Sequence, residues 1–251
     1  MEEYEIIENM IERMLFLLRY DAVLFDVSDT LIEYHPNYAQ IYGERLRRIG
    51  YKISDEKARE IARAVNYAIG EQTLREEEGE PHISDAQLNI LLDRAVLSYI
   101  GNSSDEIENN RMLLSEIPLP KQELLIMSGV IEVLTALRER YRLAIVSNHY
   151  TWLMDYLKQC GLSSFFETII ISEIVGVSKP NVRIMEIALE GLGLKADRCI
   201  YVGDQPNDVL CSKHAGLDCV WIVPKDIELP SSIPYQADYR ITQITELLNI
   251  L

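Results

Sequence analysis

The sequence is poor in positive charge. Of its 251 residues, 24 are Lys or Arg and 40 are Asp or Glu, which gives a formal net charge of -16. Nucleic-acid binding depends on clustered basic side chains that release counterions from the phosphate backbone, so this composition argues against a nucleic-acid partner. An anionic substrate would need a local positive site. With 48% hydrophobic residues, the chain can still bury a substantial core.

Cysteines are few, and none of them form a CxxC pair. This spacing predicts neither a zinc site nor a disulfide framework, and it fits a reducing cytoplasm. The sequence contains no internal repeat and no apolar run long enough to span a membrane, so no membrane partner is expected. The four cysteines are Cys160, Cys199, Cys211 and Cys219.

The first twenty residues, 1–20, open on acidic residues and lack the basic start of a signal peptide. Their apolar side chains recur at helical spacing, which predicts an amphipathic helix. Such a helix would dock on the body of the domain, or contact a partner or second subunit. The oligomeric state is left open by the sequence.

Five short apolar runs indicate buried strands, and helix-period segments follow all but the first. This alternation predicts an α/β fold in which a parallel sheet carries helices on both faces. Ligands bind at the carboxyl ends of the strands in such sheets. The five runs are 22–25, 143–146, 168–171, 199–202 and 219–223.

About 115 residues separate the first two strands, too many for a single crossover helix. Most of them have helical periodicity, so an inserted all-helical domain is expected over 34–120, with the main domain formed by 21–33 and 121–251. A charged segment that contains a glycine, 71–81, is expected to be a loop. The predicted helices are 38–49, 55–69, 85–100 and 104–115 in the insertion, and 128–141 and 181–192 in the main domain.

Four polar clusters follow strands or begin helices. Alone, each has an ordinary explanation as a turn, a helix cap or a solvated side chain. Together they supply a nucleophile, a hydroxyl that can bind phosphate, a neutralising ammonium and hard oxygen ligands for Mg²⁺. They would meet at one edge of one sheet. The clusters are Asp26 with Thr30, Ser147 with Asn148, Lys179 with Pro180, and Asp204 with Asp208.

This order, FDxxxT, SN, KP and GDxxxD, resembles the haloacid dehalogenase superfamily, in the branch with a helical cap between the first two motifs. The resemblance extends from Asp21 to Leu251 and includes the surroundings of the third and fourth motifs, such as Tyr201-Val-Gly-Asp. It implies a Rossmann-like core and hydrolysis of a small phosphorylated metabolite.

The resemblance implies a role for each motif residue. Asp26 would form an aspartyl-phosphate while Mg²⁺ is held by Asp26, the Ser28 carbonyl and Asp204, with Asp208 supporting the metal and orienting Lys179. The phosphoryl oxygens would be bound by Thr30, Ser147, the amide of Asn148 and Lys179.

Ser28 departs from the pattern of the family's phosphatases, which usually carry an Asp that protonates the leaving oxygen and then activates water. A serine does neither well at neutral pH, so turnover would be slow. Asp29 is one residue too far along, where the family commonly has glycine. Other candidates for the proton transfer are His149, which is the first to test, and Tyr34, His35 and Tyr38.

Three alternatives remain beside a slow phosphatase. A weakly active or inactive protein would bind a phosphorylated ligand or a protein partner. Dehalogenation is disfavoured because that chemistry needs no metal pair such as Asp204 and Asp208. Phosphonate cleavage would need a lysine in the cap, where Lys52 and Lys57 are the candidates.

Overall fold

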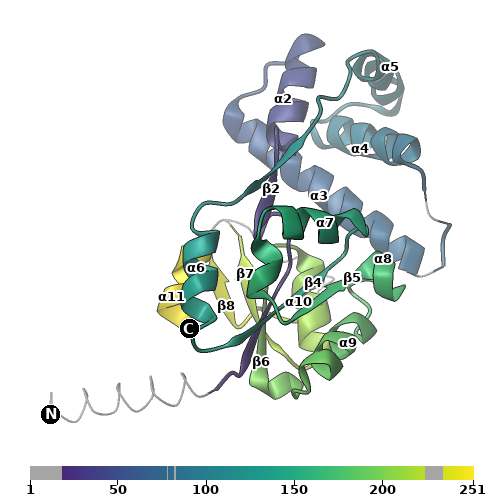
Figure 1. Ribbon diagram of the computed structural model, residues 1–251. Helices are drawn as coiled ribbons and strands as arrows, with labels where there is room; N and C mark the ends of the chain where they lie inside the picture. The colour runs from purple at the N-terminus through teal and green to yellow at the C-terminus, as the bar shows by residue number, and fades with distance from the viewer. Residues whose placement is uncertain (1–18, 78, 82, 224–233) are drawn as a thin grey trace, which may run out of the picture. The chain divides into compact units, whose positions relative to one another are not determined.

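A computed structural model describes residues 19–77, 79–81, 83–223 and 234–251 (Figure 1). The predicted helix over 1–20 lies almost entirely outside the described residues. The described chain divides into two compact units, one running to Ile32 and resuming at Ile126, the other comprising Glu33–Leu125. None of the described helices is both long enough and apolar enough to cross a bilayer.

The first unit is built on a parallel sheet of six strands in the order β5-β4-β1-β6-β7-β8. Its central strands are apolar and fully buried because helices cover both faces (Figure 1). The predicted Rossmann-like α/β core is confirmed. The strands are β1 (Ala22–Phe25), β4 (Arg142–Ser147), β5 (Thr168–Ile171), β6 (Cys199–Gly203), β7 (Asp218–Ile222) and β8 (Tyr239–Ile241).

Helices follow the strands of this unit as the periodicity predicts. The predicted helix 128–141 is shorter than expected, because Gly129 has a φ of 82° and caps its start. The predicted helix 181–192 begins later, since Lys179 and Pro180 lie in a turn before it. The helices are α6 (Val130–Leu137), α7 (Trp152–Gln159), α8 (Ser172–Val175), α9 (Arg183–Leu192), α10 (Pro206–His214) and α11 (Leu247–Ile250).

The second unit contains four helices that pack around a separate apolar cluster. Ser84 caps α4 by accepting a hydrogen bond from the Gln87 amide, and Ser54 accepts one from the Lys57 amide at the start of α3. The helices are α2 (Tyr38–Arg48), α3 (Asp55–Glu77), α4 (Asp85–Tyr99) and α5 (Ser104–Ser115).

Two features of the second unit differ from the sequence prediction. The prediction of a loop over 71–81 is wrong for residues 71–77, because α3 continues to Glu77. Gln72 donates a hydrogen bond to Glu76, one helical turn later, and this bond supports the extension. The chain also enters and leaves the unit through strands β2 (Ile32–His35) and β3 (Glu123–Ile126), which form a two-stranded sheet.

Candidate active site

The candidate nucleophile Asp26 directly follows β1 at the carboxyl edge of the sheet. Its amide donates to the Val202 carbonyl of β6, at 2.9 Å, which extends the strand pairing to the last residue before the turn. The side chain is 7% exposed. A carboxylate that is so nearly buried needs a charged partner, because desolvation of an unpaired ion is costly.

That partner is Lys179. Its Nζ donates to Asp26 Oδ1 at 2.7 Å and to Asp208 Oδ1 at 2.6 Å, so one ammonium joins the first motif to the fourth. Burial opposes the charged form of Lys179, but the charges of Asp208 and Asp26 outweigh it and raise the pKa of the lysine above its ordinary value. The ammonium is therefore permanently charged near neutral pH.

Asp208 reaches this position from the first turn of α10. Its Oδ2 accepts from the Gln205 amide at 2.9 Å, which caps the helix start. A Cβ at Gly203 would overlap the Asp208 carboxylate, so glycine is required at the end of β6. Burial raises the pKa of Asp208, while the Lys179 charge acts against that rise.

Asp204 completes a cluster of three carboxylates. Asp26, Asp204 and Asp208 each offer an oxygen, and these oxygens lie within 4.8 Å of one another. Burial, followed by the charges of Asp208, Asp29 and Asp26, raises the pKa of Asp204 well above its ordinary value. The three carboxylates carry more negative charge than Lys179 can neutralise. Their oxygens are hard donors, which suit Mg²⁺.

The Asp204 carboxylate and its backbone are both held in place. Oδ2 accepts from Gln205 Nε2 at 2.7 Å, and Oδ1 accepts a long hydrogen bond of 3.4 Å from the Thr30 hydroxyl. The backbone carbonyl of Asp204 accepts from the Trp221 indole at 2.7 Å. Thr30 therefore lies beside the carboxylate cluster, as the sequence predicts.

Ser147 is the last residue of β4, the strand that neighbours β1, and Asn148 follows it. Ser147 is 1% exposed. The Asn148 side chain makes two hydrogen bonds to the backbone of Lys179: Nδ2 donates to its carbonyl at 2.8 Å, and Oδ1 accepts from its amide at 2.7 Å. The side chain of Asn148 thus anchors the lysine loop, which leaves the backbone amide for the predicted anion contact.

Ser28 and Asp29 lie in the tight turn after β1. The amides of Thr30, Leu31 and Ile32 all lie within 3.3 Å of the Val27 carbonyl oxygen. Asp29 has a φ of 54°, the left-handed conformation that glycine adopts most easily. Ser28 is half-buried, and its side chain has no hydrogen-bond partner among the described residues.

The other candidates for proton transfer are placed differently. The His149 ring accepts from the Tyr150 amide through Nδ1 at 2.8 Å and packs edge-on against Trp152, with ring centroids 4.5 Å apart. Burial lowers the pKa of His149, so the ring is neutral at pH 7. Tyr34, His35 and Tyr38 belong to the other compact unit.

No role for Tyr201 follows from the sequence motifs, although its hydroxyl is central to the site. Tyr201 lies in β6, and its hydroxyl accepts from Lys179 Nζ at 2.8 Å and donates to the Val146 carbonyl at 2.8 Å. Burial, followed by the charges of Asp208 and Asp26, raises the pKa of Tyr201 well above its ordinary value. A lone hydroxyl in an otherwise apolar strand was the available signal.

Comparisons with known proteins agree with this architecture. A curated relative 29% identical over 92% of this chain and 96% of its own length is the glyceraldehyde 3-phosphate phosphatase of Methanopyrus kandleri. Another, the pyrimidine 5'-nucleotidase YjjG of Escherichia coli, is 32% identical over 49% of this chain. Three relatives are matched over only 55%, 37% and 38% of their own length.

Solved structures share the fold. The putative hydrolase YfnB from Bacillus subtilis, solved with magnesium bound, has a TM-score of 0.60 at 22% identity, covering 93% of this chain and 99% of that one. A dehalogenase in an intermediate complex gives a TM-score of 0.63 at 17% identity, covering 93% and 97%.

The family model for haloacid dehalogenase-like hydrolases matches residues 20–216, a stretch that includes Asp26, Lys179 and Asp208. This match spans most of the chain. Together with the Asp26–Lys179–Asp208 geometry, it identifies the chain as a member of the haloacid dehalogenase-like hydrolases.

Proposed function

We propose that the chain is a Mg²⁺-dependent phosphatase that cleaves a small phosphate monoester through an aspartyl-phosphate at Asp26. The observation that carries this proposal is the single buried ammonium of Lys179, shared between Asp26 and Asp208. A fixed positive charge beside a carboxylate at a sheet edge suits the phosphoryl group, which is attacked while its oxygens are bound.

The residues would act in two steps. In the first, Asp26 forms a bond to phosphorus as the bond between phosphorus and the ester oxygen breaks, and the ester oxygen takes up a proton from solvent. In the second, water cleaves the aspartyl-phosphate and regenerates the carboxylate. Lys179 and the hydroxyls of Thr30 and Ser147, with the Asn148 amide, would bind the phosphoryl oxygens throughout.

Mg²⁺ would be held by Asp26, Asp204, Asp208 and the Ser28 carbonyl, and when bound it would offset the negative charge of the phosphoryl group. The carboxylate oxygens within 4.8 Å of one another and the raised pKa of Asp204 support this assignment. Dehalogenation does not require such a carboxylate cluster. The cluster therefore favours attack by Asp26 on phosphorus over attack on carbon.

Ser28 makes slow turnover part of the proposal. A positioned general acid and base typically contributes about 10²–10⁴-fold to such a reaction. A serine hydroxyl at this position can donate a hydrogen bond to the leaving oxygen but cannot give up its proton at neutral pH. Both the departure of the ester oxygen and the hydrolysis of the phosphoenzyme would be slowed.

The second candidate function is a weakly active protein that binds a phosphorylated ligand or a protein partner. The same residue, Ser28, favours it.

The names of the relatives, which include a triose phosphate phosphatase and a nucleotidase, point to small phosphorylated metabolites as substrates. A cytoplasmic location and a contact through residues 1–20 stay predictions from the sequence.

Phosphate release from an aryl phosphate with Mg²⁺ tests the proposal. Wild-type protein is expected to release phosphate, and Asp26→Asn to reduce release to background, because an amide is too weak a nucleophile. The matched control is Asp21→Asn, which removes a half-buried carboxylate that pairs with Arg198 at the opposite end of β1. Equal release from wild-type and Asp26→Asn protein would exclude the enzyme function.

A second measurement separates the two candidates. A slow phosphatase should give a burst of covalent phosphate on Asp26 followed by slow release, and chelation of the metal should abolish the burst. A ligand-binding protein should retain phosphate analogues without forming the covalent adduct.

A further inference from the structure

Asp204 differs from the other two carboxylates of the cluster in what holds it. Lys179 donates to Asp26 and to Asp208. Among the described residues, no cation pairs with Asp204, although one of its carboxylate oxygens lies within 4.8 Å of oxygens of the other two. Like charges at this distance repel one another. Neutral donors must therefore keep Asp204 in position.

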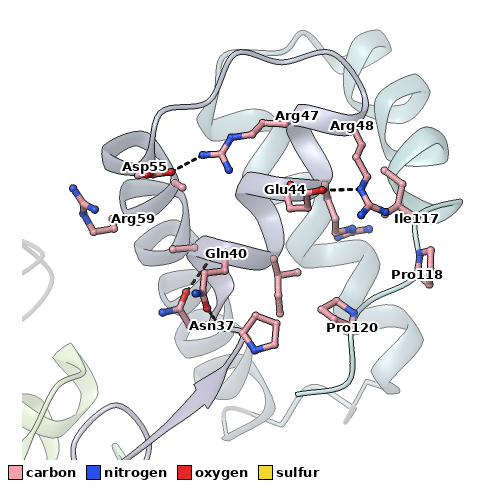
Figure 2. Close-up of a pocket in the computed structure, with 15 residues that line it drawn as sticks. Asn37, Gln40, Glu44, Arg47, Arg48, Asp55, Arg59, Ile117, Pro118 and Pro120 are labelled. Atoms are coloured by element: carbon pink, nitrogen blue, oxygen red, sulfur yellow. Dashed lines mark hydrogen bonds and ion pairs between the residues drawn. The ribbon is translucent and has the colours of Figure 1, made fainter. Parts of the chain in front are cut away.

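Two carboxylates of the helical unit Glu33–Leu125 are held in a different way, as Figure 2 shows. Beside a surface pocket, Arg47 Nη2 donates to Asp55 at 2.7 Å, and Arg48 Nε donates to Glu44 at 2.9 Å. In each of these pairs a guanidinium both orients the carboxylate and offsets its charge. A carboxylate held by neutral donors keeps its full negative charge for a cation.

Trp221 holds the backbone of Asp204. Its indole Nε1 donates to the Asp204 carbonyl at 2.7 Å. Trp221 lies in β7 opposite Gly203, the last residue of β6, so the indole begins beside the strand end that carries this carbonyl. A carbonyl just beyond a strand lies outside the ladder and needs another donor. The indole supplies that donor and fixes the point from which the Asp204 side chain extends.

The indole is itself fixed by packing. Trp221 is 2% exposed and belongs to a cluster of buried residues that includes Val209. The Arg240 guanidinium lies over the indole, 5.0 Å from the ring centroid. Val209 is part of α10, the helix that also carries Asp208. The indole therefore joins the backbone of one carboxylate of the cluster to the helix that carries another.

Gln205 holds the side chain of Asp204. Its Nε2 donates to Asp204 Oδ2 at 2.7 Å, and its backbone amide donates to Asp208 Oδ2 at 2.9 Å. One residue thus contacts two of the three carboxylates. Among the described residues, Asp204 Oδ1 accepts only a long bond of 3.4 Å, from the Thr30 hydroxyl. Oδ1 is therefore the oxygen with more capacity left for a cation.

We propose that Trp221 and Gln205 are positioning residues that set the Mg²⁺ affinity of the site by fixing Asp204 before the metal binds. This role rests on the proposed function, which assigns Asp204 to the metal. Trp221 fixes the backbone and Gln205 fixes one carboxylate oxygen, and both act through Asp204 instead of through the metal. Mutation of residues that orient a metal ligand in this way typically lowers metal affinity by about 10–100-fold.

Calorimetric titration of the full-length protein with Mg²⁺, without substrate, tests the proposal. Trp221→Phe keeps an aromatic ring in the buried cluster but removes the donor to the Asp204 carbonyl. Gln205→Leu keeps the backbone amide and removes the donor to Oδ2. Each variant is expected to raise the Kd for Mg²⁺ by about tenfold or more.

Each variant has a matched control. Trp152→Phe removes the other of the two tryptophans, which lies on α7 and is 42% exposed. Gln40→Leu removes a glutamine from the first turn of α2, where its Oε1 accepts from the Asn37 amide at 2.8 Å (Figure 2). Both controls should bind Mg²⁺ as the wild type does, and equal weakening in the controls would contradict the proposal.

Melting curves in EDTA measure stability separately from metal binding. If Trp221→Phe and Gln205→Leu lower Tm but leave the Kd for Mg²⁺ unchanged, the two residues have only a structural role, and the positioning proposal is wrong while the proposed function stands. Gln205 is only half-buried, so Gln205→Leu decides the question if Trp221→Phe does not fold. If the wild type itself binds no Mg²⁺, the metal assignment in the proposed function fails and the positioning role fails with it.

Discussion

Replacing Tyr201 by Phe tests how the site holds its lysine. The substitution removes only the hydroxyl, which accepts from Lys179 Nζ and donates to the Val146 carbonyl, both at 2.8 Å. A hydrogen bond to a charged group contributes about 1.5–3 kcal/mol and a neutral one about 0.5–1.5 kcal/mol. The free energy of unfolding should therefore fall by about 2–4 kcal/mol.

Thermal melting and kinetics measure the two consequences. For a chain of this length, 1 kcal/mol shifts Tm by about 2–4 °C, so a drop of about 4–16 °C is expected. Lys179 keeps its bonds to Asp26 and Asp208 but loses the third that fixes its direction. We expect kcat to fall by about tenfold with KM nearly unchanged, because a misdirected ammonium stabilises the transition state less.

The control is Tyr141→Phe, which removes a buried hydroxyl that donates to the Leu251 carbonyl at 3.1 Å, just before β4 and at the opposite end of that strand from Ser147. It should lower Tm by less and leave kcat unchanged. If Tyr201→Phe and Tyr141→Phe lower Tm equally and both leave kcat intact, the hydroxyl of Tyr201 does not position Lys179.

Three further predictions concern other residues. Ser28→Asp should accelerate the slow release of phosphate from Asp26 by about 10²-fold or more in single-turnover experiments, and no acceleration would show that the proton is transferred elsewhere. Burial lowers the pKa of His149 in the folded protein below the ordinary value of 6.5, so the unfolded state binds more protons as the pH falls below 6.5, and the protein loses stability. The Tm of His149→Asn should therefore fall less than that of the wild type between pH 7 and pH 5. Equal falls in Tm would contradict this. Asp93→Ala leaves the Arg45 guanidinium buried without its carboxylate and should cost about 3–5 kcal/mol in denaturant unfolding, whereas a cost below about 1 kcal/mol would mean that water reaches the guanidinium.

The strands and most helices could be predicted because their apolar residues repeat at strand or helix spacing. β1 and α5 match their predicted ranges, since buried strands and capped helices carry strong local signals. The short strands β2 and β3 were missed, because four-residue segments with mixed polarity have no readable period. The extension of α3 to Glu77 was missed because its charges resemble those of a loop.

Part of the candidate site could also be predicted from the sequence, and part could not. The positions of Asp26, Lys179 and Asp208 follow from motifs placed after strands of one parallel sheet, whose carboxyl ends share an edge. The role of the Tyr201 hydroxyl could not be predicted, because a lone hydroxyl in an apolar strand indicates that it has a polar partner but does not say that the partner is Lys179. The backbone contacts of the Asn148 side chain depend on a loop 31 residues away.

The paired hydrogen bonds between the Asn148 side chain and the Lys179 backbone limit what evolution or design can place at position 148. The residue must donate and accept at once, over 2.8 and 2.7 Å, from a side chain of one length. Aspartate would lose the donor and repel the carbonyl, and glutamine would be one methylene too long. Any transfer of this lysine loop to another scaffold must therefore carry its asparagine with it.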